Sequence, residues 1–320
     1  MITVNNSTNN QLKFLEVTES ESGQRIDNYL MKQLKGVPKS LVYRLLRKGA
    51  VRVNKKRRKP EYKIQAGDIV KIPPVHTAES GKVEIPERVI EQLKASIVYE
   101  DDSLMVLNKA SGMAVHGGSG LAWGLIEGLR KAFPDYEMIE LAHRLDRFTS
   151  GCLLLARSRP VLLNIQEQIK SHQIDKRYLT LTKGQWTPNT EKGEVKINTP
   201  LRKNAVQGGE RMVQVSEDGK EALSYFRTQH QYADAALCEV EIITGRTHQI
   251  RVHAASEGHP VAGDLKYGDD AFNKQMKQIG LSRLFLHAKS LTLLHPETNK
   301  PLTVEAPLPR ELNEVLSKLN

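Results

Sequence analysis

Apolar residues recur at helical spacing in two short stretches near the N-terminus. The first stretch holds Ile26, Tyr29, Leu30 and Leu34, and the second holds Val42, Leu45 and Leu46. Gly36 and Pro38 interrupt the pattern between them, while Ser40 can cap the second helix and Gly49 can end it. The pattern therefore predicts two short helices joined by a turn.

The segment that follows predicts two strands around a basic loop. Residues 50–74 read AVRVNKKRRKPEYKIQAGDIVKIPP, with a turn at 66–68 and two prolines at the end. Both helices can share one small core with these strands, which leaves the cations outside. Residues 23–75 resemble the small RNA-binding module named after ribosomal protein S-four. The side chains expected to bind RNA are Arg44, Arg47, Lys48, Lys55, Lys56, Arg57 and Arg58.

From Ile97 onward, apolar runs of strand length alternate with a few helical patterns. The strand-like runs include LMVLNKA, CLLLARS, YLTLTKG and LCEVEIITG, and the helical patterns include PVLLNIQEQIKSHQ and THQIRVHAASEG. Several strands follow one another across turns that are too short for crossover helices. The predicted fold class is therefore α+β, with a mixed, largely antiparallel sheet flanked by helices and loops.

The same patterns predict four segments along the chain. Residues 1–22 are polar and rich in asparagine, which favours a flexible N-terminal arm. The small module occupies 23–75, a linker with several prolines occupies 76–95, and the larger domain occupies 96–320.

Positive charge is concentrated in the small module. Residues 25–71 hold fifteen Lys or Arg against three Asp or Glu, a net charge of +12, whereas the whole chain carries +10 and the remainder therefore −2. Such a confined excess is the electrostatic footprint of a polyanion partner, and nucleic acid is the leading one. An ordinary solvated surface is the alternative reading.

Composition favours a cytoplasmic protein that stays out of membranes. No apolar run approaches the roughly 18 residues that a membrane span needs, and MITVNNSTNNQLKF lacks the features of a signal peptide. The two cysteines, Cys152 and Cys238, lie in apolar runs, so no disulfide is expected. Nothing indicates a protein partner, and a monomer is expected.

Several familiar sites are missing from the sequence. It has neither G-x-x-x-x-G-K-[ST] nor G-x-G-x-x-G, which argues against phosphate loops and dinucleotide binding. His295 to Glu297 match the H-x-E of zinc deaminases, but the cysteines that would complete that site are 86 positions apart. His248 and His253 share one predicted helix without the acidic partners of a hydrolytic zinc site. No metal site is expected.

A carboxylate between two arginines is the strongest candidate for chemistry. Asp146 of AHRLDRFTSG lies just before an apolar strand, where active-site loops often lie. In TGRTHQIRVHAA, Thr247 can cap a helix that carries more arginines, and a nearby guanidinium would keep Asp146 ionised. Tyr178 shares a strand face with Thr180 and can point into a cleft. A structural ion pair and a packed tyrosine remain the alternatives.

The order and spacing of these motifs favour the catalytic interpretation of Asp146 and Tyr178 over the structural one. HRLDRFTSG, KRYL, TGRTHQIRVHAASEGHPVAGDLKYG and LFLHAKSLTLLHP together resemble the RluA-type family of RNA pseudouridine synthases, from about residue 23 to the end. The resemblance implies Asp146 as the catalytic aspartate, Tyr178 as the active-site tyrosine, and Arg251 as the partner of the aspartate. It also implies that Arg144 displaces the target nucleotide. Further candidates for substrate binding are His143, Arg246 and His248.

The resemblance further implies a reaction and a substrate. The reaction is the isomerisation of specific uridines in 23S ribosomal RNA, or a large-subunit precursor, to pseudouridine, without a redox or metal cofactor. Asp146 could attack the anomeric carbon or remove a ribose proton, and both schemes need the carboxylate. One departure is Ala110 in NKASG, where the family commonly has proline. The alternatives are a non-catalytic ribosome-assembly factor and a synthase acting on tRNA or another RNA.

Overall fold

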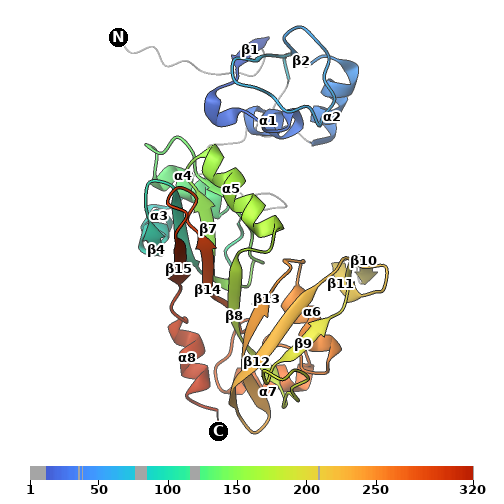
Figure 1. The fold of residues 1–320 in the computed structure, drawn as a ribbon, viewed down its shortest axis with the longest axis vertical. Coiled ribbons are helices and arrows are strands. Elements are labelled where there is room, and N and C mark those ends of the chain that lie inside the picture. The colour runs from blue at the N-terminus through green and yellow to red at the C-terminus, as the bar shows by residue number, and fades with distance from the viewer. Residues whose placement is uncertain are drawn as a thin grey trace. The chain divides into compact units, whose positions relative to one another are not determined.

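The computed structural model describes residues 12–34, 37, 39–75, 85–115, 123–207 and 210–319. The chain divides into two compact units, Met1–Glu84 and Ile85–Asn320, and each is described by itself (Figure 1). The mixed, largely antiparallel sheet predicted from the sequence is confirmed in the second unit.

The first unit packs two helices against a three-stranded antiparallel sheet. Its elements are β1 (Lys13–Glu16), the 3-10 helix η1 (Glu19–Glu21), α1 (Ile26–Gln33), α2 (Lys39–Lys48), β2 (Arg52–Val53) and β3 (Ile69–Ile72). The strands lie in the order β1-β3-β2. Both predicted helices are confirmed and share one core with the strands. The expected cap, Ser40, lies inside α2, whereas the predicted interruption at Gly36 and Pro38 lies outside the described residues.

Part of the expected N-terminal arm belongs to this unit. β1 pairs with β3 along its length, Leu15 opposite Val70, and Val17 is buried. The expectation of a loose arm over 1–22 is therefore wrong for residues 13–21, because β1 completes the sheet edge that β3 would otherwise expose. Residues 1–11 of the arm lie outside the described residues.

The second unit begins earlier than the sequence suggested. Helix α3 (Glu87–Ala95) was expected to belong to the linker, but Leu93 is buried in the core of the second unit. A Cβ at Gly128, on α4, would lie only 2.5 Å from the Cδ1 of Leu93, so the two helices pack closely. Residues 76–84 of the linker lie outside the described residues.

A ten-stranded sheet organises the second unit. Its main path is β4-β5-β7-β14-β8-β13-β12-β9, with β15 paired to β14 and β6 to β7, and only β7 and β14 run parallel among the described strands. The strands of this sheet are β4 (Ile97–Glu100), β5 (Leu104–Lys109), β6 (Glu140–Leu141), β7 (Ser150–Ala156), β8 (Asp175–Lys183), β9 (Val195–Asn198), β12 (Leu223–Gln231), β13 (Ala235–Ile242), β14 (Leu286–Leu294) and β15 (Pro301–Glu305). A separate hairpin is formed by β10 (Leu201–Gln207) and β11 (Glu210–Val215).

Helices pack against this sheet and share a buried core with it. The remaining helices are α4 (Leu125–Ala132), α5 (Arg159–Lys170), α6 (Gln249–Ser256), α7 (Asp270–Gln278) and α8 (Arg310–Leu316). α7 was not predicted, although Phe272 and Met276 are buried at helical spacing and the Asp269 side chain caps it. β7 is buried along its whole length, as its apolar run suggested.

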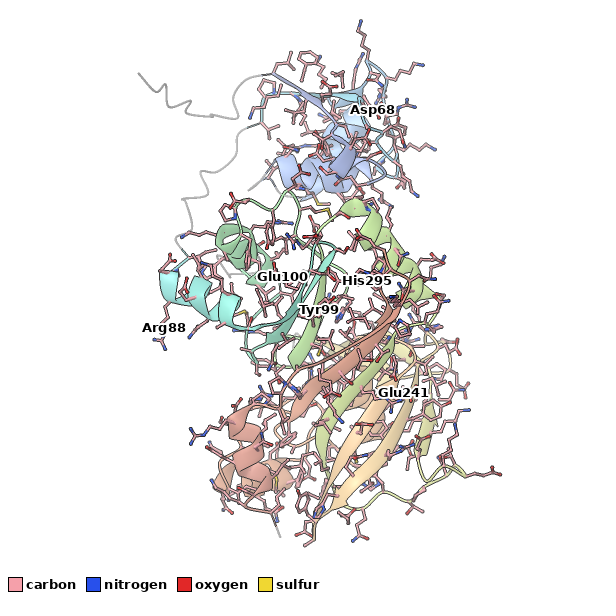
Figure 2. All side chains as sticks on the ribbon, turned by 60° about the vertical axis from the view of Figure 1, so that its left-hand side comes forward. Asp68, Arg88, Tyr99, Glu100, Glu241 and His295 are labelled. Carbon is pink, nitrogen blue, oxygen red and sulfur yellow. The ribbon has the colours of Figure 1, made fainter. Side chains whose placement is uncertain are left out.

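An ionised carboxylate joins the edge strand β4 to the end of β14. Asp101 Oδ2 accepts hydrogen bonds from the Tyr99 hydroxyl at 2.6 Å and from His295 Nε2 at 2.8 Å. Tyr99 lies on β4 and His295 follows β14, as the labelled side chains in Figure 2 show. Two segments that are far apart in the chain are thus joined at this end of the sheet.

Candidate active site

The loop that carries Asp146 is held by a buried lysine. Lys109, at the end of β5, donates from Nζ to the carbonyls of Ala110, Met113 and Arg147 at 2.9 to 3.1 Å. Burial lowers the pKa of Lys109 to about 7, the positive charge of Arg283 acts in the same direction, and Asp146 opposes them. Because three carbonyls from two loops share one donor group, the Asp146 loop has little freedom to move.

The strand after Asp146 needs glycine. Gly151 has φ +107°, and a Cβ there would lie 2.2 Å from the carbonyl oxygen of Ala288 on β14. Beside it, Arg283 Nη2 donates to Ser150 Oγ at 2.6 Å, and Ser150 Oγ lies 2.9 Å from His287 Nδ1. The close approach of β7 to β14 and this buried network fix the start of β7, and therefore the direction in which the loop leaves it.

Tyr178 projects from β8 into the same region. It pairs with Val240 on one side and Ala288 on the other, and its side chain is 8% exposed. Burial raises the pKa of Tyr178, and the negative charge of Asp146 raises it further. The phenol is therefore neutral at physiological pH, with its ring facing the cavity.

Arg251 makes a different bond from the one expected. Its Nε and Nη2 donate to the two oxygens of Asp264 at 2.7 Å each, in a buried bidentate pair. Burial alone would lower the pKa of Arg251, but the bond to Asp264 and the charges of Asp264 and Asp146 raise it. The expected direct pair between Arg251 and Asp146 is therefore wrong, because two N–H groups of the guanidinium are already bonded to the Asp264 carboxylate. Arg251 acts on Asp146 through its charge.

The nearest ionisable partner of Asp146 is His248. Its Nε2 lies 3.7 Å from Asp146 Oδ2, longer than a hydrogen bond. His248 precedes α6 with φ 55° and ψ 22°, in the left-handed region. His248 is therefore the N-cap residue of α6, and the expectation that Thr247 caps this helix is wrong. Burial lowers the pKa of His248, so its ring is neutral at pH 7.

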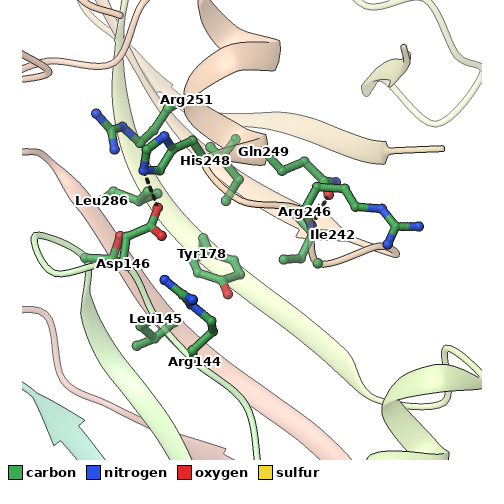
Figure 3. A pocket seen from close by; sticks show the side chains of 13 residues that line it. Arg144, Leu145, Asp146, Tyr178, Ile242, Arg246, His248, Gln249, Arg251 and Leu286 are labelled. Carbon is green, nitrogen blue, oxygen red and sulfur yellow. Dashed lines mark hydrogen bonds and ion pairs between the residues drawn. The ribbon is translucent and has the colours of Figure 1, made fainter. Parts of the chain in front are cut away.

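A cavity of about 80 Å³ brings most of the predicted site together (Figure 3). It is lined by Arg144, Leu145, Asp146, Thr149, Tyr178, Ile242, Gly245, Arg246, His248, Gln249, Ile250, Arg251 and Leu286. Among the residues predicted for catalysis or substrate binding, only His143 does not line it. His143 Nε2 accepts a hydrogen bond from the Leu154 backbone at 3.1 Å, and burial lowers the pKa of His143 to about 4. His143 therefore supports β7 as a neutral acceptor.

The basic residues of the first unit are displayed by two tight turns. After α2, Gly49 has φ +70°, and the N–H groups of Gly49 and Ala50 donate to Leu46 and Leu45, a Schellman end. Asn54 and Lys55 both have positive φ between the mutual hydrogen bonds of Val53 and Lys56, which defines a type I′ turn.

These turns leave the cations largely exposed. Arg44, Arg47, Lys48, Lys55, Lys56 and Arg57 are exposed, and Arg58 is half-buried with its guanidinium 4.2 Å from the Tyr62 ring centre. None of these seven side chains forms an ion pair with a described residue. Asp68, labelled in Figure 2, is used within the unit, since it accepts from Asn54 at 2.7 Å. The surface is therefore open to anionic ligands.

The described part of the chain contains no group of three His, Cys, Asp or Glu residues placed to hold a metal ion. His253 is fully buried, with Nδ1 3.0 Å from Ser224 Oγ and Nε2 3.0 Å from the Thr199 carbonyl. Across the same described residues, no helix is both long enough and apolar enough to span a bilayer.

Sequence reasoning missed three residues that support the site: Lys109, Asp264 and Tyr267. Tyr267 packs beside Arg251, whose Cζ is 5.0 Å from its ring centre, and its hydroxyl lies 2.8 Å from His248 Nδ1. Lys109 ends an apolar strand and Asp264 follows the apolar VAG, so a charged residue directly after a buried run was the available signal.

Comparisons with known proteins find relatives for both units. The RNA pseudouridylate synthase family matches residues 103–256, and the S4 domain matches residues 24–70. The chain is 50% identical over 313 residues to ribosomal large subunit pseudouridine synthase C of Pasteurella multocida, covering 97% of this chain and 95% of that protein. With the Escherichia coli protein of the same name it shares 49% over 312 residues, covering 96% and 97%. Human RNA pseudouridylate synthase domain containing 4 superposes with a TM-score of 0.59 at 25% identity, over 73% of this chain and 97% of that one.

Proposed function

The chain belongs to the family of RNA pseudouridine synthases, and we propose that it isomerises specific uridines of 23S ribosomal RNA. Relatives named for the ribosomal large subunit match over nearly the whole chain, basic module included, which supports this substrate. The observation that carries the proposal is the convergence of Asp146, Tyr178 and Arg251, from three distant segments, on one cavity.

Asp146 is the catalytic residue in this proposal. The bond between uracil N1 and the ribose breaks, the base turns while it stays bound, and carbon 5 bonds to the ribose. Carbon 5 loses its proton and N1 gains one, so the atoms balance. Asp146 acts as a carboxylate, either attacking the anomeric carbon or removing a ribose proton. Arg251, whose guanidinium is fixed by Asp264, brings a positive charge to the same cavity.

In this proposal Arg144 displaces the target nucleotide and Tyr178 contacts its base. A stacked uridine hides its sugar, so the nucleotide must leave the stack before Asp146 can reach it. Arg144 is exposed at the cavity, where a cation can take the place of the displaced nucleotide, and Tyr178 offers a buried ring for the uracil (Figure 3). Arg246, also exposed there, is suited to the RNA backbone.

The first unit supplies affinity. Its exposed cations bind RNA phosphates, and the substrate is 23S RNA or a large-subunit precursor. We expect the protein to act as a cytoplasmic monomer without a redox or metal cofactor. Light scattering with and without a 23S RNA fragment tests the monomer.

The decisive experiment combines mapping with one substitution. Ribosomal RNA from cells that lack the protein should miss specific pseudouridines, and purified protein should restore them on deproteinised 23S RNA. Asp146→Asn should reduce the rate at least about 10³-fold while RNA affinity stays unchanged, since the fold and the basic surface remain. Full complementation by Asp146→Asn would favour a non-catalytic assembly factor, and pseudouridines lost only from tRNA would favour a tRNA enzyme.

A further inference from the structure

His248 has a backbone conformation that needs support. A histidine in the left-handed region is strained, and such strain persists where the surroundings enforce it. The next residue provides the restraint: Gln249 Oε1 accepts from the Arg246 N–H at 3.0 Å and from Thr244 Oγ1 at 2.8 Å. Its Nε2 donates to the Leu223 carbonyl at 3.0 Å. The turn that aims His248 at Asp146 is thus fixed on both sides.

A chain of hydrogen bonds sets the tautomer of His248. The Val213 N–H, on β11, donates to the Tyr267 hydroxyl oxygen at 3.0 Å. That hydroxyl lies 2.8 Å from His248 Nδ1, which is the acceptor available to its proton, because its other described partner, the Val213 N–H, can only donate. The ring proton of the neutral imidazole is then on Nε2, which faces the Asp146 carboxylate at 3.7 Å (Figure 3). A carboxylate on that side favours the same tautomer.

Tyr267 is itself held from three directions. Its backbone N–H donates to Asp264 at 3.1 Å, and its ring lies beside the Arg251 guanidinium. It packs on the small apolar cluster that joins the β10–β11 hairpin to α6, where Val213 is buried. The hydroxyl group therefore connects the base of the hairpin to the catalytic side of α6.

We propose that His248 is a positioning residue for Asp146, presented by Tyr267 and β11, and that it does not bind the RNA directly. Across 3.7 Å its Nε2–H attracts one oxygen of Asp146 electrostatically and leaves the other for the ribose. Nδ1 is hydrogen-bonded within the protein and Nε2 faces Asp146, so this proposal replaces the substrate-binding role expected for His248. The inference rests on the proposed function, because Asp146 must be the reacting carboxylate.

Two substitutions separate positioning from backbone strain. Gln reaches the Nε2 position and can still donate to Asp146, whereas Asn reaches only the Nδ1 position but tolerates the left-handed conformation better. With saturating RNA, His248→Gln should keep kcat within a few-fold, whereas His248→Asn should lose about 10- to 100-fold in kcat at unchanged KM. The reverse order, or a change in KM alone, would overturn the proposal.

A matched control and a double-mutant cycle complete the test. His172 is also left-handed, with φ 58°, but exposed and outside the cavity, so His172→Asn should change neither kcat nor KM. Tyr267→Phe keeps the ring and should lower kcat several-fold in the wild-type background, but not further with His248→Asn. Additive losses would mean that Tyr267 acts independently of His248.

A readout without catalysis separates this inference from the proposed function. In ¹⁵N-histidine-labelled protein without RNA, His248 should show a protonated Nε2 and an unprotonated Nδ1, and Tyr267→Phe should shift the Nδ1 resonance. If wild-type protein makes no pseudouridine but shows this tautomer, the proposed function fails and the hydrogen-bond chain stands. If pseudouridine forms but Nδ1 carries the proton, the positioning inference fails alone.

Discussion

The two units handle charge in opposite ways. In the first unit Arg44, Arg47 and Lys48 of α2 and Lys55 of the Asn54–Lys55 turn are exposed and form no ion pair with a described carboxylate. In the second unit Arg144 and Arg246 are exposed at the cavity, but Arg251 is buried and Asp146 half-buried, and each of these two has a defined neighbour: Asp264 for Arg251, His248 for Asp146. Exposed charges attract a polyanion over a distance and are screened by salt. Buried charges hold atoms in place at short range.

Breaking a buried pair should give the largest effect. Arg251→Met leaves Asp264 buried without its cation, and the free energy of unfolding should fall by about 3–5 kcal/mol. Both tryptophans, Trp123 and Trp186, lie in the second unit, so denaturant titration followed by their fluorescence reports this unit alone. Arg310, paired with Glu314 but 91% exposed, is the matched control, and Arg310→Met should change stability by at most about 0.5 kcal/mol. Equal effects would erase the contrast between buried and exposed charges.

A half-buried carboxylate should give an intermediate effect that depends on pH. Burial alone would raise the pKa of Asp101, but hydrogen bonds from Tyr99, Leu104 and His295 lower it to about 2, against an ordinary 3.8. Because the folded state holds the lower pKa, this stabilisation is complete above about pH 4 and is lost as the pH falls towards 2. The lowered pKa of Asp101 contributes about 2 kcal/mol to the free energy of unfolding.

Unfolding of Asp101→Asn and wild-type protein between pH 2 and 6 measures this difference. The stability gap between them should narrow as the pH falls through that window. A gap that stays constant would show that the network of Asp101 acts through packing and not through its charge.

Neutralising four cations of the first unit should give the smallest change in binding free energy per residue and the clearest change in the salt dependence of RNA binding. Replacing Lys55, Lys56, Arg57 and Arg58 with Gln should weaken RNA binding about 10- to 100-fold, and the log–log salt slope should fall by up to about 3. The value of kcat at saturating RNA should stay the same. Filter binding at several salt concentrations measures the slope.

A control variant loses the same number of positive charges from the second unit. In it, four exposed cations are changed together to Gln: Lys170, Lys274, Lys277 and Arg310. This variant should leave the salt slope nearly unchanged. If both variants weaken binding equally, total charge matters and the placement of the cations in the first unit does not.

Sequence reasoning identified the members of the site but not their bonds. Asp146, Tyr178 and Arg251 were recognised from motifs, and all three line the cavity. The expected pair of Arg251 with Asp146 is replaced by the pair with Asp264. The direction of Asp264 is set by the backbone N–H groups of Lys266 and Tyr267, which bind its Oδ1. Such a local turn determines where a side chain points, and periodicity does not contain that information.

The fold was predictable where apolar periodicity was long. The buried strand β7 and the helices α1 and α5 follow directly from their patterns. β1 was missed because four residues in a polar context form a strand only when β3 pairs with them. The turn at Asn54 and Lys55 was expected only as a loop, since a lysine with positive φ has no composition signal.

The position of β14 has a consequence for how the protein is made. This strand lies near the C-terminus, yet it fills the gap between β7, which follows Asp146, and β8, which carries Tyr178. The first unit can fold once all its strands have left the ribosome, because it forms a core of its own. The two halves of the catalytic cavity can be joined only after β14 has been synthesised. A nascent chain could therefore bind RNA well before it could modify it.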